Sequence, residues 1–78
     1  MDKPAFHVVV TFHTSYEAMA MRKAGIDGGL QGRLIAVPQQ LSAGCGLAWS
    51  EPAENEAALR TLMAERKLEY EQVNVIEL

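Results

Sequence analysis

The chain has 78 residues, of which 49% are hydrophobic, and a net charge of −3 at pH 7 with both histidines neutral. This length accommodates one small domain, and the apolar content excludes a disordered tail. The acidic balance and the lack of a basic run argue against nucleic acid as a partner. The apolar stretch 6–12 is too short for a signal sequence or a membrane span. We therefore expect a single cytoplasmic domain over residues 1–78 with no membrane partner.

The first half of the chain has the pattern of a strand followed by a helix. Residues 6–12 are rich in β-branched and aromatic side chains, which is typical of a strand. Thr14 and Glu17 have the spacing of a capping box, in which the hydroxyl and the carboxylate each accept from an N–H of the first helical turn. This spacing predicts a helix from about Ser15 to Ala24, and Gly25 is suited to end it.

A glycine-rich connection then leads to a second strand. Residues 27–32 follow a helix and precede a strand, the reverse of the order in phosphate-binding loops, so we expect a flexible connection rather than a phosphate site. Residues 33–37 predict a strand that Pro38 ends, because proline lacks the N–H that a sheet requires. Residues 39–44 then form the loop of a hairpin.

The second half of the chain repeats the order of strand, helix and strand. Residues 45–49 predict a third strand, and Glu51-Pro52-Ala53-Glu54 has the form of a helix entry. That helix is expected to reach about Arg66 or Lys67, and residues 70–76 predict a fourth strand. In the second helix, Leu59, Leu62 and Met63 form an apolar stripe at helical spacing, with Arg66 at its edge, and this stripe is expected to face the core. The methionines Met19, Met21 and Met63 are also expected to fill the core.

The βαββαβ order predicts a ferredoxin-like α+β fold, with a four-stranded antiparallel sheet and two helices on one face. In this topology the third strand lies between the first and the second, and the fourth pairs on the outer side of the first. The start of the third strand should then lie close to Phe12, His13 and the helix that Thr14 caps.

The single cysteine, Cys45, lies between Gly44 and Gly46. One cysteine excludes an internal disulfide and a C-x-x-C pair. Glycine neighbours leave the thiol accessible and expose backbone N–H groups, as thiol chemistry requires. The alternative is a turn whose glycines serve the backbone, with Cys45 a small apolar side chain in the core.

The chain has two histidines, and each is considered as a partner of this thiol. A helix N-terminus and a nearby imidazolium both favour a thiolate, so His13 is a candidate electrostatic partner or proton acceptor for Cys45. The alternative is a loop histidine that faces solvent. His7 belongs to the start of the first strand, at the other end of the sheet, so we expect no metal site with Cys45.

The residues around Cys45 resemble a known family. Ala36-Val37-Pro38-Gln39 and Leu41-Ser42-Ala43-Gly44-Cys45-Gly46-Leu47-Ala48, together with Thr11-Phe12-His13-Thr14, are similar to the small bacterial and archaeal domains described as selenium/sulfur carrier-like proteins. Gln39 stands where that family often has a basic residue. The resemblance implies that Cys45 holds sulfur or selenium as a persulfide or perselenide, in a loop supported by Pro38, Ser42, Gly44 and Gly46. It also implies donor and acceptor proteins as partners.

We therefore expect a carrier without a cofactor or metal, rather than an enzyme with turnover. A different class of function is a module that senses a small ligand or binds a protein, with a homodimer face formed by Val9 and the apolar residues of the fourth strand. A thiol redox sensor is a third alternative.

Overall fold

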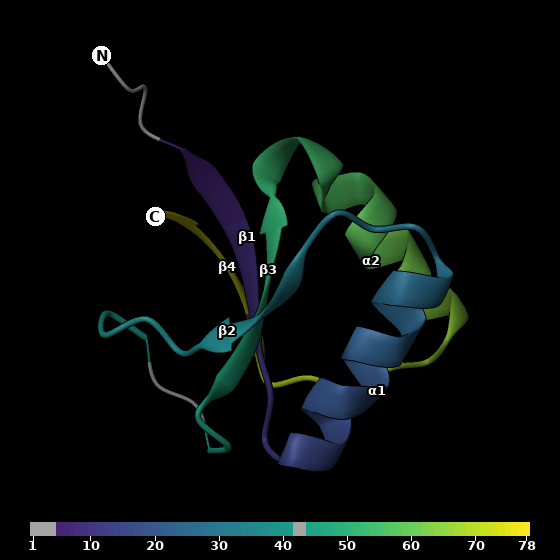
Figure 1. Ribbon diagram of the computed structural model, residues 1–78, viewed down its shortest axis with the longest axis horizontal. Coiled ribbons are helices and arrows are strands. Elements are labelled where there is room, and N and C mark those ends of the chain that lie inside the picture. The colour runs from purple at the N-terminus through teal and green to yellow at the C-terminus, as the bar shows by residue number, and fades with distance from the viewer. Residues whose placement is uncertain (1–4, 42–43) are drawn as a thin grey trace.

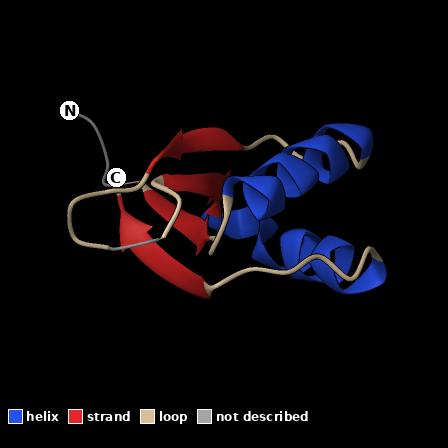
Figure 2. Ribbon diagram, turned by 90° about the horizontal axis from the view of Figure 1, so that it is seen from below, coloured by secondary structure: helices blue, strands red, loops and turns tan. Residues whose placement is uncertain are grey.

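The computed structural model describes residues 5–41 and 44–78, which form one four-stranded sheet and two α-helices. The elements are, in chain order, β1 (Phe6–Thr11), α1 (Ser15–Asp27), β2 (Arg33–Ala36), β3 (Leu47–Pro52), the 3₁₀ helix η1 (Ala53–Asn55), α2 (Glu56–Glu65) and β4 (Gln72–Glu77). The strand order is β2-β3-β1-β4, and all neighbouring strands are antiparallel. Both helices cover the same face of the sheet (Figure 1, Figure 2). The predicted ferredoxin-like α+β fold is confirmed.

The hydrophobic core lies between the sheet and the two helices. Successive side chains of a strand point to opposite faces, and the even-numbered residues of β1 face the helices. The buried cluster combines residues of the sheet with residues of both helices: Val8, Val10, Phe12, Ala18, Met21, Trp49, Leu59 and Met63. Burying each large apolar side chain of this kind contributes about 1.5–3 kcal/mol. Met21 and Met63 belong to the core as predicted, whereas Met19 is exposed on α1, so its assignment to the core is wrong.

Helix α1 begins as predicted and ends later. Thr14 is the N-cap, and its hydroxyl accepts a hydrogen bond from the Glu17 N–H at 3.2 Å. Gly25 does not end the helix, which continues to Asp27 with Gly28 as its C-cap. Gly25 is instead buried against Trp49: a Cβ built on it would lie 2.7 Å from the indole ring. Its lack of a side chain therefore lets α1 approach the sheet. None of the helices in residues 5–41 and 44–78 has the length and apolar character of a membrane span.

Strand β3 lies further along the chain than predicted. It spans Leu47–Pro52, and Glu51 is a buried strand residue rather than part of a helix entry. The carboxylate of Glu51 accepts four hydrogen bonds, from the backbone N–H groups of Gln31 and Gly32 and from the side chains of Trp49 and Asn55, at 2.9–3.1 Å. These donors compensate the cost of burying a carboxylate.

The Glu51 contacts also change the expected nature of the glycine-rich connection. The N–H groups of Gln31 and Gly32 hold the Glu51 carboxylate, so this segment is anchored to β3. The later start of β3 moves the second helix as well: η1 follows Pro52, and α2 begins at Glu56. Strand β4 begins at Gln72, two residues after the predicted start.

The face of the sheet away from the helices is partly covered. Figure 2 shows the loop after β2 on this side, opposite the helices. Val9 and Thr11 of β1 point to this face and are fully buried. Val9 lies between Ser50 and Asn74 in the register of the sheet. Because its side chain is fully buried, Val9 is not part of an exposed dimer face, contrary to the expectation from sequence.

Candidate functional site

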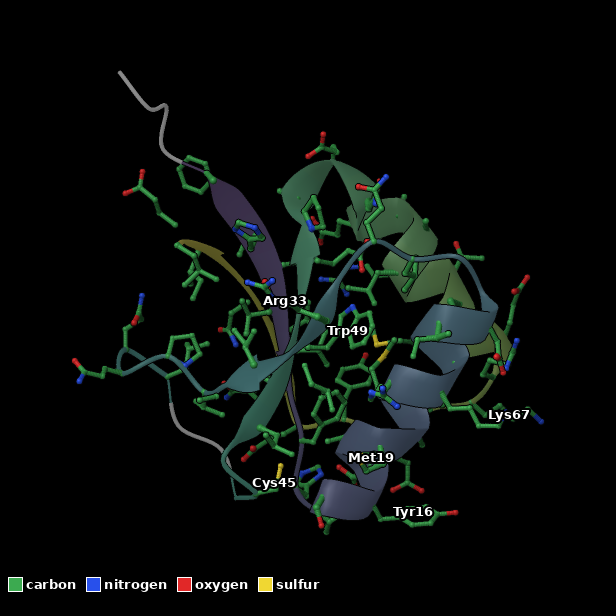
Figure 3. The ribbon with its side chains drawn as sticks, in the orientation of Figure 1. Tyr16, Met19, Arg33, Cys45, Trp49 and Lys67 are labelled. Carbon is green, nitrogen blue, oxygen red and sulfur yellow. The ribbon has the colours of Figure 1, made fainter. Side chains whose placement is uncertain are left out.

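Cys45 lies in the loop that leads into β3, toward the end of the molecule where α1 begins (Figure 3). Its side chain is half-buried and packs against the edge of the core. The backbone N–H of Leu47 donates to the Cys45 sulfur at 3.4 Å, and the sulfur is 3.6 Å from the Leu47 carbonyl oxygen. The first residue of β3 thus fixes the position of the sulfur.

Glycines on either side of Cys45 fix the path of this loop. A Cβ built on Gly44 would lie 2.8 Å from the His13 carbonyl oxygen, so the chain passes directly against the backbone of His13. Gly46 has a φ of 76°, which favours glycine because a side chain is strained there. The Gly46 carbonyl accepts from the Val37 N–H at 3.1 Å and closes the base of the loop. The loop therefore holds Cys45 beside the segment that starts α1.

His13 is bound to Glu17 through two contacts. The Glu17 carboxylate accepts from the His13 backbone N–H at 2.8 Å and lies 3.1 Å from the ring Nδ1. The Glu17 carboxylate therefore binds His13, the residue before the N-cap Thr14. These contacts lower the pKa of Glu17 from its ordinary value of 4.5, chiefly through the His13 backbone hydrogen bond and then through the His13 ring.

The orientation of the His13 ring follows from this contact. An ionised carboxylate only accepts hydrogen bonds, so Nδ1 carries the proton in the pair with Glu17. The other ring nitrogen, Nε2, is then left as an acceptor when the imidazole is neutral. Within residues 5–41 and 44–78, no hydrogen bond joins the His13 ring to the Cys45 sulfur.

The remaining predicted site residues have separate positions. The Pro38 carbonyl accepts from the Leu41 N–H at 2.9 Å and forms a turn after β2. Ser42 lies outside the described residues. His7 is on the opposite face of the sheet from the core, in register with Pro52 and Ile76, near the end remote from Cys45. In the part of the chain that is described, no three His, Cys, Asp or Glu side chains are arranged to hold a metal ion.

Sequence reasoning missed one partner in this region. Glu17 was assigned only to the capping box, although it also binds the His13 ring. The signal was the spacing of four residues between His13 and Glu17, which brings a residue just before a helix close to the end of its first turn.

Comparison with known protein families gives a match over most of the chain. The model of the family described as "Putative Se/S carrier protein-like" matches residues 7–74. The chain therefore belongs to this family, as the sequence around Cys45 indicates. No curated protein and no solved structure shows a significant match to it.

Proposed function

We propose that the protein carries a sulfur or selenium atom on Cys45, as a persulfide or perselenide, between a donor protein and an acceptor protein. The observation that carries this proposal is the held thiol: a half-buried sulfur with a backbone N–H donor at 3.4 Å, in a loop that lies against the start of α1. The family that matches residues 7–74 supports the same role.

Loading transfers one sulfur atom from a donor persulfide to Cys45. The Cys45 thiolate attacks the terminal sulfur of a donor persulfide, the sulfur–sulfur bond of the donor breaks, and a new bond forms between Sγ and the transferred sulfur. The donor leaves as a thiolate, so the donor is reduced as Cys45 is oxidised, and no external oxidant is needed. A perselenide forms by the same displacement at selenium. Delivery reverses these steps with the thiolate of the acceptor.

His13 and Glu17 have a supporting role in this proposal. Glu17 keeps the proton on Nδ1 and leaves Nε2 of His13 available as a proton acceptor beside the Cys45 loop. A protonated His13 also adds positive charge near the start of α1, where the helix dipole already favours an anion. Both effects favour the thiolate that loading requires. Neither effect requires His13 or Glu17 to catalyse a reaction, which agrees with a carrier.

A carrier also needs a surface that its partner proteins recognise. Tyr16 and Met19 are three residues apart on α1, with 82% and 51% of their surface exposed. Figure 3 shows Tyr16 and Cys45 toward the same end of the molecule. Exposed aromatic and methionine side chains are enriched where proteins bind each other. We include Tyr16 and Met19 in the proposed contact with the donor.

Loading is tested by intact mass spectrometry after incubation with a small persulfide donor, for wild type and Cys45→Ser. We expect the wild type alone to gain the mass of one sulfur, and a thiol reductant to remove it. Loading of Cys45→Ser would refute the proposal, as would a wild type that stays unmodified under the same conditions. Wild type that forms only disulfide-linked dimers would favour the redox sensor instead.

The proposed contact of Tyr16 with the donor is tested separately. The rate of loading of Tyr16→Ser is measured with a protein donor and with a small persulfide. Loading from a persulfide-bearing protein should be slower than in wild type, whereas loading from the small persulfide should be unchanged, because the thiol itself is intact. The matched control is Thr61→Ser, an exposed position on α2. Equal rates for Tyr16→Ser and wild type with the protein donor would remove Tyr16 from the contact.

A further inference from the structure

The face of the sheet away from the helices carries a concave site, at the end remote from Cys45. This depression of about 470 Å³ lies between the start of β1, the start of β2 and the end of β3, and His7, Arg33 and Ser50 line it. Arg33 pairs with Ser50 in the register, whereas Cys45 precedes Leu47, the first residue of β3. Figure 3 likewise shows Arg33 well separated from Cys45. The site is therefore distinct from the thiol.

The charges on this face differ from those of the whole chain. The chain has ten Asp and Glu residues against seven Lys and Arg. The strand positions that share the face of His7 nevertheless include no acidic side chain: His7, Val9, Thr11, Arg33, Ile35, Ala48, Ser50, Pro52, Gln72, Asn74 and Ile76. Arg33 forms no ion pair with any side chain in the described ranges. The side chains that line the depression thus include the Arg33 guanidinium and no acidic group, which favours an anionic ligand.

A second polar group in the depression lacks a partner. The Nδ1 atom of His7 is buried, and within residues 5–41 and 44–78 it has no hydrogen-bond partner. A buried polar atom without a partner is unfavourable, so turning the His7 ring until Nδ1 donates to a bound ligand would gain stability. Ser50, which is only 8% exposed, contributes a further polar side chain to the wall. These groups come from three neighbouring strands and converge on one site.

Three apolar residues also line the depression. Besides Gln31 and Gly32, the apolar residues Ile35, Pro52 and Leu78 form part of the walls, and the volume is within the range of small-molecule sites. A guanidinium binds an oxyanion through two parallel hydrogen bonds, while the apolar walls suit a hydrocarbon substituent. We propose that this depression binds a small organic oxyanion, a carboxylate or a phosphate monoester, with its anionic group at Arg33 and His7. This site would be independent of the carrier role of Cys45.

The proposal is tested by ¹⁵N NMR titration with four probes: phenyl phosphate, benzoate, inorganic phosphate and benzyl alcohol. We expect an organic anion to shift the amide signals of His7, Arg33 and Ser50, and to bind more tightly than inorganic phosphate or the neutral alcohol. Comparison of phenyl phosphate with benzoate distinguishes the two kinds of head group. Equal binding of benzyl alcohol and the organic anions would overturn the proposal, as would shifts confined to the start of α1.

Variants assign the binding to this depression. Arg33→Gln should weaken binding of the preferred anion by about tenfold or more, because it removes a charged donor. Arg22→Gln, an exposed arginine on α1, is the matched control and should bind like wild type. Unchanged affinity of Arg33→Gln would refute the site. Cys45→Ser should bind normally, so a failure of the carrier proposal and a failure of this one are distinguishable.

Discussion

The backbone of Gly44 lies against the carbonyl group of His13, with room for a hydrogen atom but not for a methyl group: a Cβ there would be 2.8 Å from the His13 oxygen. This contact joins the cysteine loop to the segment that starts α1. The position of the Cys45 thiol relative to His13 and the helix N-terminus therefore depends on a residue without a side chain.

Gly44→Ala should change the reactivity of the thiol more than the stability of the fold. The new methyl group pushes the loop away from His13, so the Cys45 thiol moves away from the start of α1, where the residues proposed to favour its thiolate lie. We expect alkylation by iodoacetamide at neutral pH to slow several-fold. Gln40→Ala, an exposed position in the same loop, is the control and should react like wild type. Equal alkylation rates for Gly44→Ala and wild type would show that this contact does not tune the thiol.

Glu17 should make stability depend on pH in acid. Its pKa is lowered in the folded protein, so its contribution is present above its ordinary value of 4.5 and is lost as the pH falls through the lowered folded value. Glu17→Gln removes this contribution. We expect the free energy of unfolding of the variant to be below that of wild type at about pH 5.5 and the difference to be smaller at about pH 3.

Urea denaturation at these two pH values tests the expectation. Glu65→Gln, at the exposed end of α2, is the control, because Glu65 forms no ion pair with the residues described. A constant difference between Glu17→Gln and wild type across the two pH values would contradict the assigned role of the His13 contact.

Gly25→Ala should destabilise the protein although alanine is the better helix former. Alanine gains up to about 1 kcal/mol in helix propensity, whereas forcing a methyl group into a packed core costs about 1–3 kcal/mol. The methyl group would lie 2.7 Å from the buried Trp49 ring, so we expect a net loss of about 1–2 kcal/mol in urea denaturation. The cost should shrink in a Trp49→Phe background, which provides space. Additive effects of the two substitutions would contradict this explanation.

Glu51→Gln should be costly because four donors surround the carboxylate. A glutamine amide presents its own N–H₂ group to some of these donors and leaves them without an acceptor, at a cost of about 2–3 kcal/mol. That is a large share of the roughly 4–12 kcal/mol expected for a chain of this size. Thermal denaturation should show the loss, and Glu54→Gln, on the exposed surface of η1, should melt like wild type. A variant at Glu51 as stable as wild type would show that the carboxylate is not an anchor.

The fold was predictable because its signals are local. The alternation in 6–12, the capping spacing of Thr14 and Glu17, and the turn residues before β3 define the order of the elements, and the order determines the topology. The loop of Cys45 could be placed near His13 for the same reason, since the end of β1 and the start of β3 meet at one end of the sheet.

Other features depend on contacts between distant residues. Gly25 has the local pattern of a helix end, but its role is set by Trp49, 24 positions further along the chain. Glu51 resembles an acidic helix start, yet it is buried because Gln31 and Gly32 supply donors from another part of the chain. The depression at Arg33 likewise needs three strands to bring His7, Arg33 and Ser50 together.

The most direct measurement is the intact mass of the protein purified from cells without reductant, compared with Cys45→Ser purified in the same way. Wild type is predicted to contain a fraction that is heavier by one sulfur or one selenium, removable by a thiol, and the variant should contain none. A wild type of unmodified mass, or an equal adduct on both proteins, would contradict the assignment of Cys45 as the carrier residue.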